Sequence, residues 1–173
     1  MNSDKASAKV KADLAIIWKG CEAAGKARLG RRHAGAYSTP CSKINRMTVG
    51  TGIDIAETER IERALERHGE RFARKVFTPA EIAYCEKFKN RAERYAARFA
   101  AKEAAFKALG TGWAKGVRWL DVEVAHHSSG KPELVLTGRA REVANQLGVT
   151  HTAMSISHAN RYVVAQVILE SNT

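Results

Sequence analysis

The long amphipathic helix predicted near the middle of the sequence carries a carboxylate on its apolar stripe. The helix is expected to start after Asn90, which forms a cap pair with Glu93, and to stop at a left-handed Gly110. Its inward stripe recurs at steps of three and four residues and comprises Ala92, Tyr95, Phe99, Glu103 and Phe106. Burying an unpaired carboxylate is costly, so Glu103 needs a charged or hydrogen-bonding partner.

One candidate partner is Lys107, a turn later on the same helix. A Glu-before-Lys pair at i,i+4 contributes only about 0.2–0.5 kcal/mol on an exposed helix. This pairing is the simplest structural explanation of Glu103 if the helix is considered alone.

A second isolated carboxylate, Asp54, offers another explanation. In the segment 49–55, apolar and Thr residues alternate with Gly and Asp, which is the period of a half-buried strand. Asp54 must point to the opposite face from Ile53 and Ile55, and we expect that face to be the one away from the core. Two carboxylates on a rigid strand and a rigid helix suit Mg²⁺, which takes one or two carboxylates, waters and substrate phosphates. Alternatively, Asp54 caps the helix that follows it.

The segments around this helix predict an α+β fold. Residues 58–68 have helical spacing and end at Gly69, and Thr78 with Glu81 forms a capping box for a short second helix. Strands are expected in residues 118–127, 132–137, 151–158 and 162–170, with a helix over 137–148. Short connections favour antiparallel pairing. We therefore expect a small antiparallel β-sheet packed with a long helix and several short helices.

The chain of 173 residues is strongly basic, with a formal net charge of +11. Residues 1–46 hold ten Lys/Arg and three acids, so most of the excess lies there. This segment is a solvated tail, a transit-like leader, or sequence upstream of a true start at Met47; we expect a weakly ordered extension before a domain of residues 47–173. A basic tail can bind nucleic acid or anionic membrane, but such runs are more often simply solvated.

The remaining composition favours a soluble cytoplasmic protein. No apolar run approaches the roughly 20 residues that a membrane-spanning helix needs. The three cysteines, Cys21, Cys41 and Cys85, form no CxxC pair, which favours free thiols in a reducing compartment.

Five segments occur in the order and spacing of a known family: "GIDIAETERI", "FT..E", "RFAAKEAAFKALGTG", "GKP" and "SISH....VAQV". The chain from about Gly50 to Val167 resembles the holo-acyl-carrier-protein synthases, the small 4′-phosphopantetheinyl transferases. The resemblance implies transfer of the 4′-phosphopantetheine arm of coenzyme A to a serine of apo-acyl carrier protein, which supports fatty acid biosynthesis. It also implies a homotrimer with each active site between neighbours.

The resemblance also implies residue roles. Mg²⁺ would be held by Asp54 and Glu103, and catalysis would be assisted by Glu103 and Lys107. Coenzyme A would be contacted by Arg98, Lys102, Gly110, Gly112 and His158. The acidic carrier protein would meet Arg60 on the first helix and Arg71 just after it.

Two other interpretations have less support in the residues. The larger pseudo-dimeric phosphopantetheinyl transferases would need two copies of the motif set, and this chain has one. A nucleic-acid-binding module would use the basic excess, but the sequence lacks a zinc pattern, a recognition helix or a stacking-aromatic motif. We therefore expect neither nucleic acid nor membrane as a partner.

Overall fold

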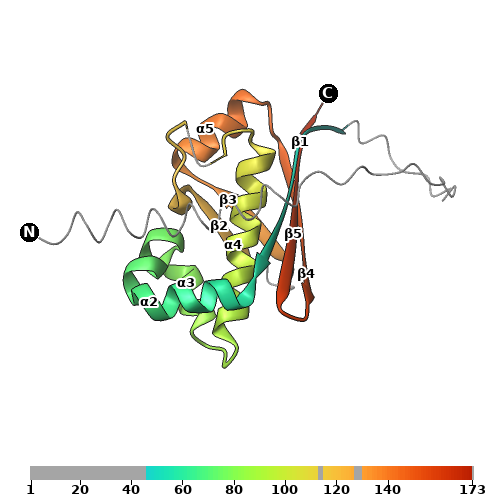
Figure 1. Ribbon diagram of the computed structural model, residues 1–173. Coiled ribbons are helices and arrows are strands. Elements are labelled where there is room, and N and C mark those ends of the chain that lie inside the picture. Colours follow the sequence, from blue (N-terminus) through green and yellow to red (C-terminus); the bar gives the residue numbers. More distant parts are fainter. Residues whose placement is uncertain (1–45, 113–114, 127–129, 173) are drawn as a thin grey trace, which may run out of the picture.

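The computed structural model describes residues 46–112, 115–126 and 130–172. They form, in chain order, β1 (Arg46–Glu57), α2 (Thr58–Val76), α3 (Pro79–Cys85), α4 (Arg91–Ala108), the 3-10 helix η1 (Trp119–Asp121), β2 (Val122–His126), β3 (Pro132–Leu136), α5 (Gly138–Gln146), β4 (His151–Ala159) and β5 (Tyr162–Asn172) (Figure 1). The predicted α+β class is confirmed. Except for Arg46, the predicted N-terminal extension lies outside the described residues.

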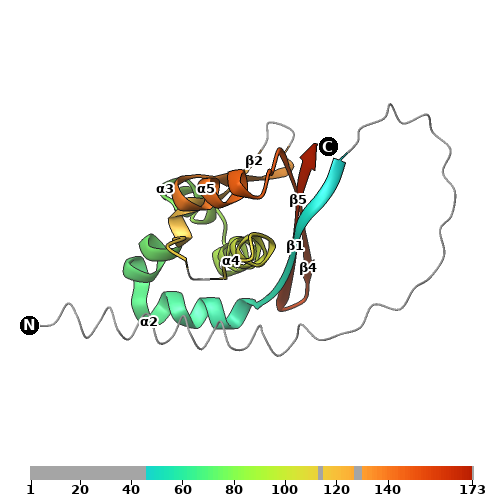
Figure 2. The same cartoon turned by 90° about the horizontal axis from the view of Figure 1, so that it is seen from above.

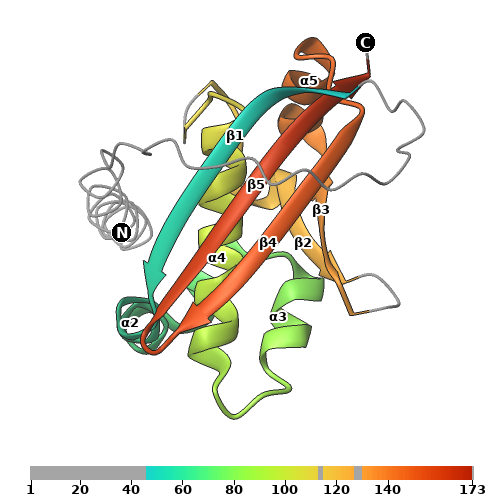
Figure 3. The ribbon, with the colours of Figure 1, turned by 90° about the vertical axis from the view of Figure 1, so that its right-hand side faces the viewer.

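The strands form two antiparallel sheets, whereas the sequence analysis predicted one. The larger sheet has the order β1-β5-β4, and β2 pairs with β3 in a separate hairpin. Figure 3 shows the three long strands side by side with α4 behind them. The strand that we predicted from residue 118 starts only at Val122, as β2. The Asp121 carboxylate accepts hydrogen bonds from the backbone and side chain of Arg118, and these bonds close a helical turn at η1.

Helix α4 is the centre of the fold. Seen end-on in Figure 2, it has the β1-β5-β4 sheet on one side and helices around the other sides. Fourteen of its 18 residues are buried, so it has no solvent-facing side of the usual width. The single inward stripe that we predicted is therefore too narrow. Arg98 and Lys102 are buried one helical turn apart on one side of α4, and Glu103 is buried on another side.

Strand β1 lies directly against the backbone of α4. A Cβ atom added to Gly52 would be 1.9 Å from the carbonyl oxygen of Ala104, and one added to Gly50 would be 2.2 Å from that of Ala108. Only glycine allows so close an approach of a strand to a helix. This contact places the next residue on the same face, Asp54, against α4.

The prediction that Asp54 lies on the face away from the core was wrong. Asp54 is 2% exposed and faces α4, whereas Ile53 and Ile55 are 55% and 44% exposed on the opposite face. The residues do alternate between two faces as predicted, but the face with the glycines, not the face with the isoleucines, packs against α4.

Helix α2 continues past the glycine at which we expected it to end. Gly69 has φ 52° and ψ −136°, a non-helical conformation that kinks α2, and the helix resumes up to Val76. The continuation is stabilised by burial of Phe72 and Val76 in the core. No helix among the described residues is long and apolar enough to span a membrane.

Candidate active site

Asp54 and Glu103 bring two carboxylates together inside the protein. Asp54 extends from β1 and Glu103 from the middle of α4, and each is no more than 2% exposed. In the described part of the chain, Asp54 Oδ2 and both carboxylate oxygens of Glu103 have no hydrogen-bond partner. Native proteins rarely leave buried polar atoms unpaired, so these three oxygens mark a candidate site for a group outside the described residues.

Lys107 is part of this site, but not as the i,i+4 partner of Glu103. Its Nζ donates to Asp54 Oδ1 at 2.9 Å and to the backbone carbonyl of Ile53 at 3.0 Å. The lysine side chain is 29% exposed, so it joins the buried carboxylate to the surface. The structure therefore favours the interpretation in which Glu103 and Asp54 act as a pair.

The pKa of Glu103 shows that the buried carboxylate pair has too little positive charge beside it to keep both groups ionised. Burial and, to a smaller extent, the nearby carboxylate of Asp54 raise the pKa of Glu103 to about 9, although the Lys107 ammonium acts to lower it. In the protein alone, Glu103 thus holds a proton at neutral pH.

The oxygen donors fit a hard divalent cation. Three unpaired carboxylate oxygens on two rigid elements match Mg²⁺, which usually binds one or two carboxylates and completes its octahedron with water and phosphate. Within residues 46–112, 115–126 and 130–172, no three or more His, Cys, Asp or Glu side chains come together as a metal site, so the donors here are the two carboxylates alone. A cation here would also offset the burial and the repulsion from Asp54 that together raise the pKa of Glu103.

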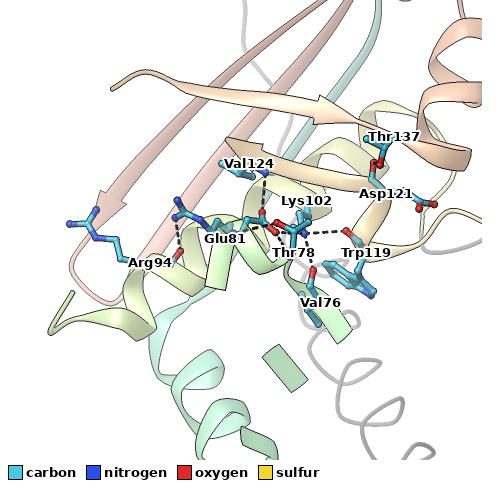
Figure 4. A network of polar contacts seen from close by, with 10 residues as sticks. Val76, Thr78, Glu81, Arg94, Lys102, Trp119, Asp121, Val124 and Thr137 are labelled. Atoms are coloured by element: carbon cyan, nitrogen blue, oxygen red, sulfur yellow. Dashed lines mark hydrogen bonds and ion pairs between the residues drawn. The ribbon is translucent and has the colours of Figure 1, made fainter. Parts of the chain in front are cut away.

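The structure contradicts the expectation that Lys102 contacts a ligand. Its Nζ is fully buried and bonds Glu81 Oε2 at 2.7 Å and the carbonyls of Val76 and Trp119 at 2.8 and 3.1 Å (Figure 4). The other oxygen of Glu81 accepts from the backbone of Val124 at 2.9 Å. Lys102 therefore anchors α4 to its neighbours, and its three donors leave none for a phosphate.

The same network confirms the predicted capping box of α3. Thr78 Oγ1 accepts from the Glu81 amide, and Glu81 Oε2 accepts from the Thr78 amide at 2.8 Å. Sequence spacing found this box, but it gave no sign that Glu81 also meets Lys102, because the two residues come from different helices.

Arg98 lies on another side of α4 from the carboxylate pair. Five residues separate it from Glu103, which is about 140° around the helix. Its guanidinium stacks over the Tyr84 ring at 4.0 Å, and one nitrogen lies 3.5 Å from His126 Nδ1. Arg98 is 3% exposed, and its Nε has no partner among the described residues.

This cation has further positive charge beside it. Burial lowers the pKa of His126, and the Arg98 and Arg94 guanidiniums lower it further. Arg94 stacks over Phe88 at 4.7 Å, and its Nε is also buried without a partner in the described chain. Arg94 and His126 were not predicted from the sequence. The buried Nε atoms of Arg94 and Arg98, which have no partner among the described residues, make this cluster a candidate anion contact.

His158 is placed at the end of β4, where its Nδ1 lies 2.6 Å from Glu93 Oε1. Glu93 lines a surface pocket between the first turns of α2 and α4, together with Arg161. Neither Asp54 nor Glu103 lines that pocket. Within one chain, His158 and the carboxylate pair are therefore separate features.

Of the two glycines after α4, Gly110 has the left-handed conformation that we predicted, and Gly112 shares it. Gly110 and Gly112 have φ of 66° and 54°, in the left-handed region. A Cβ at Gly110 would meet nothing within 4 Å, so its role as a helix stop explains it without a ligand. The arginines expected to meet a partner, Arg60 and Arg71, both lie on α2, on either side of its kink.

Three comparisons with known proteins find relatives of this chain. The model of the 4′-phosphopantetheinyl transferase superfamily matches residues 50–167. A holo-[acyl-carrier-protein] synthase of Solibacter usitatus is 55% identical over 125 residues, covering 72% of this chain and 100% of the relative; one of Vibrio cholerae is 51% identical over 124 residues, covering 72% and 98%. A crystal structure of a holo-(acyl-carrier-protein) synthase from Bacillus anthracis in complex with CoA (3′,5′-ADP) is 40% identical, covers 73% of this chain and 99% of its own, and has a TM-score of 0.61.

The matched segment includes residues 50–57 of β1, the whole of α4 and residues 162–167 of β5, from the elements that build the carboxylate pair and the sheet behind it. The relatives align over nearly their full length, so the similarity is not confined to one motif. The chain therefore belongs to the 4′-phosphopantetheinyl transferase superfamily.

Proposed function

We propose that this protein is a holo-[acyl-carrier-protein] synthase. It transfers the 4′-phosphopantetheine group of coenzyme A to a serine of apo-acyl carrier protein and releases adenosine 3′,5′-bisphosphate. The observation that carries the proposal is the buried carboxylate pair with three unpaired oxygens beside Lys107, in a chain similar over nearly the full length of proteins with that activity.

We propose that Asp54 and Glu103 hold Mg²⁺. The support is the donor set: hard oxygen ligands, preorganised on a strand and a helix, that no protein group satisfies in the described residues. When bound, the ion would neutralise charge on the diphosphate of coenzyme A and orient it for in-line attack.

Glu103 and Lys107 supply the other catalytic roles in this proposal. With the cation bound, Glu103 would be ionised, and its carboxylate would then be suited to help remove the serine proton. Lys107 is held over Asp54 and is partly exposed, which suits it to stabilise negative charge developing on the leaving phosphate.

Coenzyme A would be held by cations and open backbone. Arg98, with its unpaired Nε and neighbouring Arg94, is suited to a phosphate, and His158 and the left-handed Gly110 and Gly112 remain proposed contacts. Lys102 is no longer in this set, because Glu81 and two backbone carbonyls occupy its ammonium.

We propose that the protein is a homotrimer and that neighbouring copies complete each active site. Two observations support this. Arg98 and Glu103 lie on different sides of α4, so one compact ligand does not reach both in a single chain. The outer face of the β1-β5-β4 sheet also exposes Ile53 at 55%, Ile55 at 44% and Tyr162 at 45%, an apolar surface suited to burial between copies.

The carrier protein would dock on α2. This helix starts at Thr58, directly after the strand that carries Asp54, so Arg60 in its first turn follows that strand closely. Acyl carrier proteins are acidic, and Arg60 and Arg71 would steer them by charge. We place the enzyme in the cytoplasm, since Cys85 is a free thiol of the kind that persists in a reducing compartment.

Mass spectrometry of apo-acyl carrier protein after incubation with the protein, coenzyme A and Mg²⁺ tests the function directly. We expect the serine to gain the phosphopantetheine mass, and chelation of divalent ions to stop the gain. Asp54→Ala and Glu103→Ala are expected to abolish loading, while Glu133→Ala, on the β2–β3 hairpin, serves as a matched carboxylate control. A carrier left unmodified by the wild-type protein would overturn the proposal.

A further inference from the structure

Two glycines on β1 allow the strand to lie close to α4 because they have no side chain, and not because of their backbone conformation. Gly50 and Gly52 are not among the described residues with positive φ, so their backbone conformation is open to any amino acid. What excludes a side chain at Gly52 is contact: its Cβ would lie 1.9 Å from the Ala104 carbonyl oxygen and 2.7 Å from the Ala108 amide nitrogen.

This contact lies next to both carboxylates. Asp54 is two residues beyond Gly52 on the same face of the strand, roughly 6.7 Å along it. Glu103 directly precedes Ala104, whose carbonyl the glycine touches. The gap between β1 and α4 at Gly52 is therefore the gap that the two carboxylates span.

A single methyl group would widen that gap measurably. Real Cβ atoms essentially never come within 3.0 Å of a heavy atom outside their own and the neighbouring residues. At Gly52 the Ala104 oxygen would be 1.9 Å from the Cβ. The obstacle is helix backbone in a buried, close-packed helix, so it does not swing aside as a side chain would. Strand β1 would have to move away from α4 by about 1 Å, and Asp54 would move with it.

We propose that Gly52 is a positioning residue that fixes the spacing of Asp54 and Glu103 and thereby selects a cation of the size of Mg²⁺ over larger ions. The inference rests on the proposed function, in which this pair holds the metal. Mg²⁺ demands near-ideal octahedral geometry with oxygens at about 2.0–2.1 Å, whereas Ca²⁺ accepts about 2.3–2.6 Å and irregular geometry. A displacement of the Asp54 carboxylate by about 1 Å therefore exceeds what the coordination geometry of Mg²⁺ tolerates, whereas it weakens Ca²⁺ binding much less.

The test is the binding of Mg²⁺ and Ca²⁺ to the full chain by isothermal titration calorimetry at one pH. Gly52→Ala is expected to weaken Mg²⁺ binding about 10–100-fold, the range seen when groups that orient metal ligands are changed, and to weaken Ca²⁺ binding less. The control is Gly138→Ala, a position with φ 48° and an obstruction 2.9 Å away at Asp121 Oδ1, at the start of α5. This control should lower the melting temperature and leave the Mg²⁺ to Ca²⁺ affinity ratio unchanged.

A second variant keeps the test decisive if Gly52→Ala does not fold. Asp54→Glu leaves the glycine contact intact and lengthens the carboxylate by one methylene group. If the gap is fixed, the longer side chain does not fit and Mg²⁺ binding weakens. Mg²⁺ affinity equal to that of the wild type would show that β1 shifts freely, and would overturn the inference.

Glu103→Gln separates this inference from the proposed function. If the wild type does not bind Mg²⁺, or if Glu103→Gln binds it equally well, the metal site itself is refuted and the inference falls with it. If Glu103→Gln loses Mg²⁺ but Gly52→Ala keeps the wild-type Mg²⁺ to Ca²⁺ ratio, the metal site stands and the role of Gly52 is refuted.

Discussion

Glu103→Gln is expected to make the metal-free protein more stable at alkaline pH while abolishing its activity. The glutamine keeps the shape of the protonated carboxyl but has no charge to lose. In the wild type, folding raises the pKa of Glu103 from 4.5 to about 9. A raised acid pKa adds stability that is fully present below pH 4.5 and is lost as the pH rises toward 9, because the unfolded chain releases the proton first.

The size of the effect follows from the pH interval. Between pH 5.5 and 8.0 the wild type should lose about 1.4 kcal/mol of unfolding free energy per pH unit through this group, or about 3 kcal/mol in all. The variant lacks this loss. The assay is urea unfolding of both proteins at the two pH values with a chelator present, which gives the wild-type-minus-variant difference at each pH.

Glu86→Gln is the matched control. Burial acts to raise the pKa of Glu86, but hydrogen bonds from Arg91 and Tyr95 together lower it. A lowered acid pKa adds stability that is present above the unfolded value of 4.5 and is lost only as the pH falls below it, so this variant's difference should be constant from pH 5.5 to 8.0. If the Glu103→Gln difference is equally constant, then Glu103 is already ionised in the metal-free fold and the reasoning fails.

Further substitutions test the network, the catalytic lysine and the partner surface. Glu81→Gln leaves the buried Lys102 ammonium without its counter-charge and should cost roughly 3–5 kcal/mol in denaturant unfolding; a change below 1 kcal/mol would contradict a charged pair. Lys107→Ala should lower kcat for carrier loading about 100-fold or more, and near-normal turnover would remove it from catalysis. Arg60→Glu should raise the KM for the carrier protein and leave that for coenzyme A unchanged; equal increases in both would argue against a carrier-specific contact.

Local patterns predicted the elements well, because each depends on residues close in sequence. The Thr78–Glu81 capping box and the left-handed stop at Gly110 were both confirmed. Gly69 shows the limit of such signals: a glycine breaks helical geometry, but whether the chain resumes the helix depends on burial of the residues beyond it.

The alternation along β1 fixed which residues share a face but not which face packs. Apolar Ile53 and Ile55 indicated one answer, and the close contact of Gly52 with α4 imposes the other. An alternating pattern separates the two faces of a strand but does not say which of them is buried. The element that packs on the strand, here α4, decides that.

The sequence by itself determined that a carboxylate stands where α4 is buried, and that the surrounding motifs are those of one enzyme family. Only the tertiary structure decided the partners: Lys107 bonds Asp54 rather than Glu103, and Lys102 bonds Glu81 rather than a ligand. The physical reason is distance along the chain. A helical period identifies neighbours within one or two turns of the same helix. The charged groups that pair with a buried side chain come from strands and helices tens of residues away in the sequence.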